Sequence, residues 1–328
     1  MTYDKAKESF SLLFEGEMDE KRMREFLLSM KLDENTSVES IAAAAEVMRS
    51  HAIKLPISEE LRLKAVDVVG TGGDKIGSFN ISSTVALLAS ACGSYVAKHG
   101  SRSVTSKSGS ADMFEELGVK LDLSIENSAI LLQETGFTFM FAQNYHPAMK
   151  FIMPVRKSIS DKTIFNILGP LTNPADVKKS LLGVFDKAFV PKMLEALKIN
   201  GATSAMVVSS QEGMDEISIS GITYASQLRD GIVHEFEIDP EEYGIKKMPL
   251  KAIIGGDANK NAQILYDIFD GSATDAQRDI VLINTAATLM VDGLVRDIQD
   301  GLEMAKEAIR KSKAKEKLKQ IVKISNQL

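Results

Sequence analysis

The chain has 328 residues, 44% hydrophobic and 26% charged, so it can bury a large core as one big domain or two modest ones. Its net charge of −6 disfavours nonspecific nucleic-acid binding, and one cysteine, Cys92, allows neither an internal disulfide nor a thiolate metal site. With no signal peptide and no apolar run of membrane-spanning length in the sequence, we expect a soluble cytoplasmic protein without nucleic-acid or membrane partners.

Residues 1–65 predict a small all-helical domain. Apolar residues recur at helical spacing over Asp4–Phe14 and Asp19–Met30. Thr36-Ser37-Val38-Glu39 has the pattern of a capping box before a third helix, Ile41–Met48. A linker at 54–58 follows.

Residues 66–328 predict a larger α/β domain. Short β-rich runs alternate with helices, which favours a mostly parallel central sheet flanked by helices, with ligands beyond the carboxyl ends of its strands. Residues 214–238 predict β hairpins, and helices are expected at Asp275–Val291 and Gln299–Ile324. The expected strands are Ala65–Val69, Tyr95–Lys98, Lys120–Leu123, Thr138–Phe141, Ser180–Phe185 and Ala205–Ser209.

A glycine-rich loop follows the first strand, with four glycines in residues 70–77, and Asn80 and Ser82 then open a helix. Glycine permits positive φ and close backbone approach, and a helix N-terminus attracts phosphate. Lys75 stands where a dinucleotide fingerprint needs glycine, and Ser78-Phe79 stands where a P-loop needs Lys-Ser/Thr. The sequence therefore predicts a phosphate loop of another kind, in which Asp74 requires a metal or a sugar hydroxyl beside it.

A second polar cluster, residues 98–110, holds three cations and six hydroxyl groups between a strand and a helix. This composition predicts an anion-binding loop, with Ser110 capping the helix that follows; the alternative is a solvated loop without a ligand.

Charged residues farther along suggest a metal and a carboxylate ligand. The adjacent carboxylates Asp215 and Glu216 suit Mg²⁺ that also binds substrate phosphates, although exposed acidic pairs are common. Arg156, in a helical stretch over 146–159, could grip a carboxylate or form a surface ion pair. The histidines lack metal-ligand spacing, and only His99 is expected near a ligand.

Six segments, in chain order, resemble the anthranilate phosphoribosyltransferase family over nearly the whole chain. They are Gly-Thr-Gly-Gly-Asp (70–74), Asn-Ile-Ser-Ser (80–83), the polar segment 98–112, Pro-Val-Arg (154–156), Leu-Gly-Pro-Leu-Thr-Asn-Pro (168–174) and Met-Asp-Glu (214–216). The resemblance implies transfer of phosphoribosyl from phosphoribosyl pyrophosphate (PRPP) to anthranilate with release of pyrophosphate, the second step of tryptophan biosynthesis. It also implies a homodimer with the fold of the nucleoside phosphorylases, in which part of 150–180 joins the helical domain.

The resemblance further implies the site residues. Two Mg²⁺ ions per subunit are expected on the pyrophosphate, held by Ser82, Asp215 and Glu216. Anthranilate is expected at Gly70, His99, Ser101 and Arg156, although Ser101 stands where the family usually has asparagine and has a shorter reach. No residue is implied as an acid or a base. PRPP is expected at Gly70, Gly73, Asp74, Ser78, Asn80, Ile81, Ser82, Ser83, Lys98, His99, Gly100, Ser101, Arg102, Ser103, Val104, Thr105, Ser106 and Ser110.

Two other functions remain open. A pyrimidine nucleoside phosphorylase would share the fold and the anion loop but would use inorganic phosphate, and the Asp215-Glu216 pair favours a pyrophosphate ester instead. A non-catalytic nucleic-acid-binding member should lose these carboxylates and gain basic surface, whereas this chain keeps them and is acidic.

Overall fold

The computed structural model describes residues 1–102 and 107–328, so the predicted PRPP ligands Ser103, Val104, Thr105 and Ser106 lie outside the described residues. Within the described part, seven strands form one sheet in the order β3-β2-β1-β4-β5-β6-β7. The strands are β1 (Ala65–Gly70), β2 (Tyr95–Gly100), β3 (Phe137–Phe141), β4 (Lys179–Gly183), β5 (Ser204–Ser210), β6 (Thr223–Arg229) and β7 (Ile232–Ile238). The strands from β3 to β5 in this order pair in parallel and the last two are antiparallel, which confirms the mostly parallel sheet.

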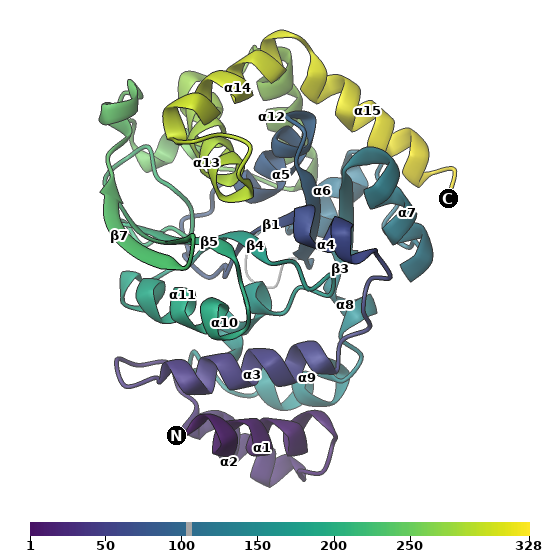
Figure 1. Cartoon of the computed structure of the whole chain (residues 1–328), viewed down its shortest axis with the longest axis vertical. Helices are drawn as coiled ribbons and strands as arrows, with labels where there is room; N and C mark the ends of the chain where they lie inside the picture. Colours follow the sequence, from purple (N-terminus) through teal and green to yellow (C-terminus); the bar gives the residue numbers. More distant parts are fainter. Residues whose placement is uncertain (103–106) are drawn as a thin grey trace.

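Helices surround this sheet and extend beyond it (Figure 1). The α-helices are α1 (Tyr3–Phe14), α2 (Glu20–Ser29), α3 (Val38–Ser50), α4 (Glu59–Lys64), α5 (Ile81–Ala91), α6 (Ser110–Glu116), α7 (Ile125–Thr135), α8 (Ala142–Tyr145), α9 (Met149–Lys157), α10 (Phe165–Leu168), α11 (Val190–Ile199), α12 (Ala258–Asp270), α13 (Asp275–Asp292), α14 (Ile298–Arg310) and α15 (Lys313–Ser325). Short 3-10 turns are η1 (Gly169–Leu171), η2 (Lys187–Phe189), η3 (Pro240–Tyr243) and η4 (Leu250–Ile253). No described helix is long and apolar enough to cross a membrane.

The two faces of the sheet bury different apolar cores, because successive side chains of a strand point to opposite faces. Val66 and Val68 of β1 join the core that contains α5 and α13. Leu182 of β4 and Val207 of β5 join a second core with α11 and the N-terminal helices. Burial on both faces accounts for the nearly continuous apolar runs that predicted these strands.

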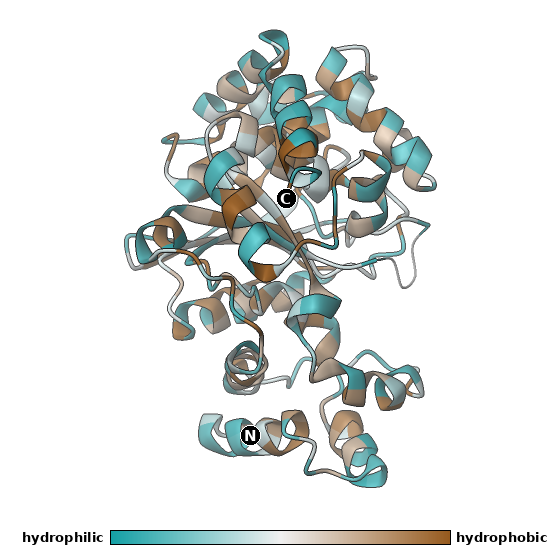
Figure 2. Cartoon of the chain, turned by 90° about the vertical axis from the view of Figure 1, so that its right-hand side faces the viewer, coloured by the Kyte–Doolittle hydropathy of each residue, from teal (hydrophilic) through white to brown (hydrophobic). Residues whose placement is uncertain are grey.

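The N-terminal helices α1, α2 and α3 lie with α9 at one end of the long axis, opposite the C-terminal helices (Figure 1). The turned view shows the same helical layer beneath the α/β body (Figure 2). Phe10, Leu27 and Ile152 are fully buried in the core of this layer. The chain after α9 also pairs with it, since Leu32 N donates to Lys162 O at 3.0 Å.

Three expected elements differ in the structure. Lys120–Leu123 is not a strand, because Lys120 N donates to Ser325 Oγ on α15 at 3.2 Å instead of joining the sheet. Of the hairpins expected over 214–238, only β6–β7 forms, turning at Asp230 (φ 53) and Gly231 (φ 77). The expected helix Gln299–Ile324 is broken by Ser312 in the left-handed region, φ 59.

Helix starts also differ by one residue from the expected ones. The N-cap of α3 is Ser37, whose side chain accepts from Ser40 N at 3.2 Å, and not Thr36 of the expected capping box. Gly109, not Ser110, precedes α6, and the Asp112 carboxylate accepts from Gly109 N at 2.8 Å.

Candidate anion and metal site

The predicted site residues follow strands that end at one edge of the sheet. β1 and β4 end at the register partners Gly70 and Gly183, β2 ends at Gly100, and β5 ends at Ser210. The loops after these parallel strands therefore meet at the carboxyl edge, where α/β sheets bind ligands.

The paired glycines Gly70 and Gly183 make room for Asp215. A Cβ atom at Gly70 would lie 2.2 Å from Asp215 Oδ2, and one at Gly183 would lie 1.6 Å from Asp215 O. The glycine loop then turns through positive φ at Gly72 (67) and Gly73 (77), and Gly72 N donates to Asp215 Oδ2 at 2.6 Å. The loop and the acidic pair thus form one unit.

Glu216 lies at the N-terminus of α5, where Ser82 N donates to its Oε1 at 3.1 Å. Lys98 Nζ donates to Val68 O at 2.5 Å and contacts Ser82 Oγ at 3.3 Å. Lys98 is only 1% exposed, so its amino group lies in the protein interior, where electrostatic interactions are stronger than in water.

The pKa values of Asp215 and Glu216 are raised by burial and by the negative charges of neighbouring carboxylates. Burial, and next the charge of Asp74, raise the pKa of Asp215 to about 7. Burial, and next the charge of Asp215, raise the pKa of Glu216 well above its usual range, although Lys98 opposes this shift. Burial lowers the pKa of Lys98. A bound cation would relieve the repulsion between the carboxylates.

The donor set of this site fits Mg²⁺. Asp215, Glu216 and the Ser82 hydroxyl offer only oxygen atoms, which Mg²⁺ prefers. Among the described residues no group of three His, Cys, Asp or Glu side chains could hold a metal by itself. An ion here would need further oxygens from substrate and water, as Mg²⁺ in phosphate sites usually has.

Several predicted PRPP ligands connect α5 to neighbouring helices. Asn80 Oδ1 accepts from Asn261 Nδ2 of α12 at 2.8 Å, and Asn80 Nδ2 donates to Ser108 O at 3.2 Å. Ser83 Oγ contacts Ser110 Oγ of α6 at 2.9 Å. The structure therefore brings Asn80, Ser83 and Ser110 to the start of α5, beside Ser82.

Most of the contacts of the remaining predicted PRPP ligands involve backbone groups. Gly73 lies in the positive-φ turn, and Asp74 Oδ1 accepts from Ile76 N at 3.1 Å. Ser78 pairs with Ile254 in an isolated bridge, while Ile81 has a buried side chain and its N–H donates to Phe79 O at 2.7 Å.

The segment after β2 is held against a ring and a helix. A Cβ at Gly100 would lie 2.9 Å from the Phe139 ring, so the backbone passes close to β3. Ser101 Oγ donates to Arg102 O at 3.0 Å, and Arg102 Nη1 pairs with Asp112 and Glu115 of α6, each at 2.8 Å. These ion pairs raise the pKa of Arg102 and direct its guanidinium to α6.

His99 lies against His146, with ring centroids 5.0 Å apart. Burial, and next the charge of His146, lower the pKa of His99 to about 3, and burial lowers that of His146 to about 4. Both rings are therefore neutral at pH 7. Their Nε2 atoms are buried without a hydrogen-bond partner in the described part of the chain.

Arg156 on α9 is half-buried, and burial lowers its pKa. Its guanidinium lies 5.9 Å from the Phe165 ring centroid and forms no ion pair with any carboxylate in 1–102 or 107–328. A half-buried guanidinium without a carboxylate partner is suited to bind one from a ligand.

Three side chains at this edge were not predicted from the sequence. Asp67, fully buried in β1, accepts from Asn173 Nδ2 at 2.7 Å. A carboxylate inside an apolar strand is a detectable signal for Asp67, and Asn173 falls in the recognised segment 168–174. Lys162, whose Nζ donates to Gly73 O at 3.3 Å, had no distinguishing signal among the lysines of the chain.

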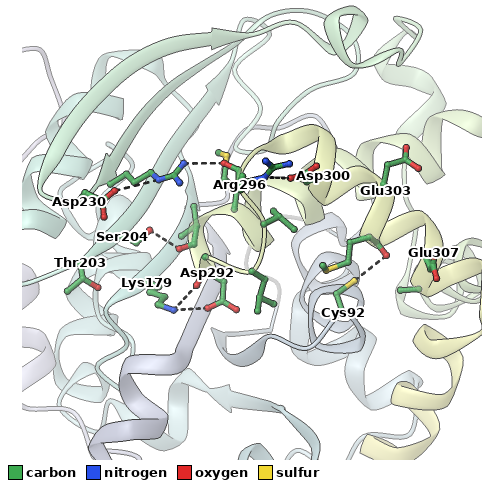
Figure 3. A pocket seen from close by; sticks show the side chains of 18 of the residues that line it. Cys92, Lys179, Thr203, Ser204, Asp230, Asp292, Arg296, Asp300, Glu303 and Glu307 are labelled. Atoms are coloured by element: carbon green, nitrogen blue, oxygen red, sulfur yellow. Dashed lines mark hydrogen bonds and ion pairs between the residues drawn. The ribbon is translucent and has the colours of Figure 1, made fainter.

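A cavity of about 920 Å³ lies elsewhere, lined by the first residues of β4 and β5 (Figure 3). Polar side chains of its lining form hydrogen bonds and ion pairs with other residues of the protein. Lys179 Nζ contacts Asp292 Oδ1 at 3.0 Å, and Ser204 Oγ donates to Val291 O at 2.7 Å. Cys92 lines this cavity, and burial raises the pKa of its thiol to about 12. This cavity thus lies at the amino edge of the sheet, whereas Asp215 and Glu216 lie at the carboxyl edge.

The mostly parallel sheet carries a glycine-rich loop and a half-buried acidic pair at its carboxyl edge, an arrangement that suits an enzyme acting on a phosphate ester. In agreement, residues 62–315 match the family described as "Glycosyl transferase family, a/b domain". An anthranilate phosphoribosyltransferase of Persephonella marina is 41% identical over 98% of this chain and 94% of the relative. The chain belongs to the anthranilate phosphoribosyltransferase family, which confirms the resemblance seen in the sequence.

Solved structures agree. The anthranilate phosphoribosyltransferase of Thermus thermophilus is 34% identical, with a TM-score of 0.92 over 99% of this chain and 96% of that one. The Saccharomyces cerevisiae anthranilate phosphoribosyltransferase in complex with PRPP and Mg is 24% identical, with a TM-score of 0.89 over 100% and 94%. The yeast likeness concerns the fold alone.

Proposed function

We propose that the chain transfers the 5-phosphoribosyl group of PRPP to the amine of anthranilate, releasing pyrophosphate and forming N-(5-phosphoribosyl)anthranilate. The observation that carries this proposal is the half-buried acidic pair Asp215 and Glu216 against the glycine loop and the N-terminus of α5. A metal-chelated diphosphate supplies the cations that this pair lacks and the anion that the loop and Lys98 would bind.

Mg²⁺ would be held by Asp215, Glu216 and the Ser82 hydroxyl. When bound, it neutralises charge that develops on the leaving pyrophosphate. Lys98 and the N–H groups at the start of α5 add preorganised positive potential. Support for the metal comes from the oxygen donor set, and the yeast relative was solved with PRPP and Mg. We propose two ions per subunit, as the family resemblance implies.

Anthranilate would bind through its carboxylate to Arg156, beside the neutral His99 and near Gly70 and Ser101. An aromatic amine is unprotonated at pH 7, so the nucleophile needs no strong base, and neutral His99 is available only as a polar contact. Catalysis then rests on alignment of two substrates and on electrostatics.

For PRPP, we propose the ligand set predicted from the sequence. Contacts near the start of α5 support Asn80, Ser83 and Ser110, and the positive-φ turn supports Gly73 and its neighbour Asp74. Arg102 would bind PRPP with its side chain only if its ion pairs with α6 broke, and otherwise through its backbone. Gly70, Ser78, Ile81, Ser82, Lys98, His99, Gly100, Ser101 and residues 103–106 complete the set.

We also propose a two-domain subunit, with 1–65 and part of 150–180 in the helical domain and the rest of 66–328 in the catalytic domain. The packing of Ile152 with Phe10 and Leu27 supports the return of this segment. We propose a homodimer, as the family resemblance implies. A single cysteine supports a cytoplasmic location.

The direct test mixes the protein with PRPP, anthranilate and Mg²⁺ and follows the loss of anthranilate fluorescence. Turnover that requires all three components and releases pyrophosphate is expected. Phosphorolysis of thymidine or uridine without metal would favour the phosphorylase alternative instead, and salt-sensitive DNA binding without turnover would favour the non-catalytic alternative.

A further inference from the structure

Lys162 connects the helical layer to the glycine loop. Its backbone is fixed beside α2: its carbonyl accepts from Leu32 N at 3.0 Å, and the next residue, Thr163, forms a bridge with Lys31. Asp161, just before it, pairs with Lys31 Nζ at 2.9 Å. The main chain at Lys162 is thus attached to the segment that follows α2 in the helical layer.

The side chain of Lys162 leaves this layer and reaches the α/β body. Its Nζ donates to Gly73 O at 3.3 Å and lies 3.2 Å from the centroid of the Phe185 ring, just after β4. A cation over an aromatic face is attracted to it, so Phe185 fixes the direction of a long and otherwise flexible side chain.

The loop residue that Lys162 contacts, Gly73, is next to Gly72, which contacts Asp215. Gly72 N donates to Asp215, and the next residue, Gly73, accepts from Lys162, so one short turn is held from both sides. Both glycines have positive φ. Glycine adopts positive and negative φ with similar ease, so these two residues do not by themselves hold the turn in one conformation. The hydrogen bonds of Gly72 with Asp215 and of Gly73 with Lys162 therefore restrain the conformation of the turn.

We propose that Lys162 is a positioning residue for the phosphoribosyl transfer reaction: it holds the 72–75 turn, from the helical layer, in the conformation that receives the diphosphate of PRPP. This inference rests on the proposed function. It makes the placement of the helical layer, which also carries Arg156, a determinant of PRPP binding at the loop. A residue that acts in this way should affect KM for PRPP more than kcat or KM for anthranilate.

The test compares Lys162→Met, which keeps a long side chain on Phe185 but removes the charge and donor, with Lys162→Arg, which keeps both. We expect KM for PRPP to rise about fivefold in Lys162→Met, as loss of one hydrogen bond of moderate strength would give, and to return to within about twofold of wild type in Lys162→Arg. KM for anthranilate should change by less than about twofold. The matched control is Lys187→Met, since Lys187 also lies over a ring, Tyr224, at 4.4 Å and does not touch the loop.

A second readout separates positioning from direct contact with substrate. In the absence of PRPP, amide hydrogen exchange over residues 70–77 should be faster in Lys162→Met than in wild type, and unchanged in Lys187→Met. Equal rises in both KM values, an unchanged KM for PRPP, or unchanged exchange over 70–77 would overturn the inference. Inactive wild-type protein would instead count against the proposed function, and the exchange comparison would still decide the role of Lys162.

Discussion

At the scale of single residues, the site depends on groups whose charge is not balanced within the described chain. Arg156 is half-buried without a carboxylate partner in that part of the chain. Asp215 and Glu216 are half-buried beside each other, and their charge is opposed by Lys98 and, at Asp215, also by Lys162. Such groups cost stability and are kept where a ligand compensates them.

Arg156→Ala should raise KM for anthranilate on the order of 30-fold, because a charge-assisted contact with a carboxylate is worth a few kcal/mol. KM for PRPP should change far less. Steady-state kinetics with each substrate varied in turn measures both values. Lys157→Ala, the exposed neighbour on α9, is the control and should leave both unchanged. Similar rises in the two KM values would contradict the assignment of Arg156 to anthranilate.

Asp215→Asn should move activity and stability in opposite directions. The pKa of Asp215 is raised to about 7, so its protonated form favours folding at low pH, and this contribution is lost as pH rises through 7. At pH 8 without metal, the neutral asparagine should therefore raise the melting temperature, while its oxygen can still accept from Gly72 N. The Mg²⁺ concentration for half-maximal activity should rise at least about tenfold, since one carboxylate ligand is lost.

Thermal unfolding at pH 8 with and without Mg²⁺ and PRPP checks both effects. Wild type should gain more from the ligands than Asp215→Asn does. Asp230→Asn, an exposed acid in the β6–β7 turn, serves as the control for a change of net charge. A variant that is less stable than wild type without metal would show that Asp215 is a structural carboxylate.

At the scale of elements, buried side-chain amides join segments that the sheet itself does not connect. Asn173, between η1 and β4, donates to Asp67 Oδ2 of β1 at 2.7 Å and to Ala97 O of β2 at 2.8 Å. Its own oxygen accepts from Ala175 N at 2.8 Å. The chain that returns from the helical layer is thereby bonded to the neighbouring strands β1 and β2.

Asn173→Asp should destabilise the protein by about 2–4 kcal/mol at pH 8, because it removes both donors and places a second carboxylate beside buried Asp67. Burial raises the pKa of Asp67 to about 6 against the opposing effect of Lys98, so the repulsion should weaken below pH 6. Urea unfolding at pH 5.5 and pH 8 measures this, with Asn173→Ala as the reference. If Asn173→Asp and Asn173→Ala lost equal stability at both pH values, the carboxylate contact would be absent.

Local sequence predicted the elements whose backbone partners are close along the chain or lie within the sheet. The strands from β1 to β5 and the opening of α5 were expected from apolar runs and the glycine loop. Lys120–Leu123 was predicted as a strand because its partner, Ser325, is supplied by the far end of the chain. The loop before β6 is irregular for the same kind of reason, since Ile217 N donates to Asn284 Oδ1 of α13 at 2.9 Å.

The candidate site was predicted for a different reason than the fold. Its glycines, hydroxyl groups and acidic pair form contiguous segments with a characteristic order, so they could be identified without knowing the tertiary contacts. Lys162 could not, because an isolated lysine becomes informative only when its distance from Gly73 and Phe185 is known. Arg102 shows the converse: its segment suggests an anion ligand, whereas its guanidinium pairs with Asp112 and Glu115.

At the scale of the whole molecule, His99 and His146 lie where the α/β body meets the connections to the helical layer. His99 lies near the end of β2, and its ring forms a hydrogen bond with the backbone of Gly169. His146 precedes α9, and its ring forms a hydrogen bond with the backbone of Thr172. The two rings, 5.0 Å apart, join the outgoing and returning segments to the sheet. Lys98 is a further positive charge near His99. Protonation of either ring would place a charge inside this junction.

This junction should make the protein acid-sensitive in a defined pH window. Both histidines have a folded-state pKa below the unfolded value of 6.5, so their contribution to stability is present above pH 6.5 and is lost as pH falls toward 4 and 3. In that window each neutral histidine should lower the free energy of unfolding by up to about 1.4 kcal/mol per pH unit. His146→Gln should therefore flatten the dependence between pH 6 and 4.5 by up to about 2 kcal/mol in total.

Urea unfolding at pH 7.5, 6.0, 5.0 and 4.5 would measure the slope in wild type, His146→Gln and the control His234→Gln. His234 is exposed on β7, so its replacement should leave the slope unchanged. His146→Gln is expected to be less stable than wild type at pH 7.5 and to approach it at pH 4.5, because only wild type must take up the proton on unfolding. Parallel curves for wild type and His146→Gln would mean that the ring is solvated and free to titrate in the folded protein, and the junction would then not limit acid stability.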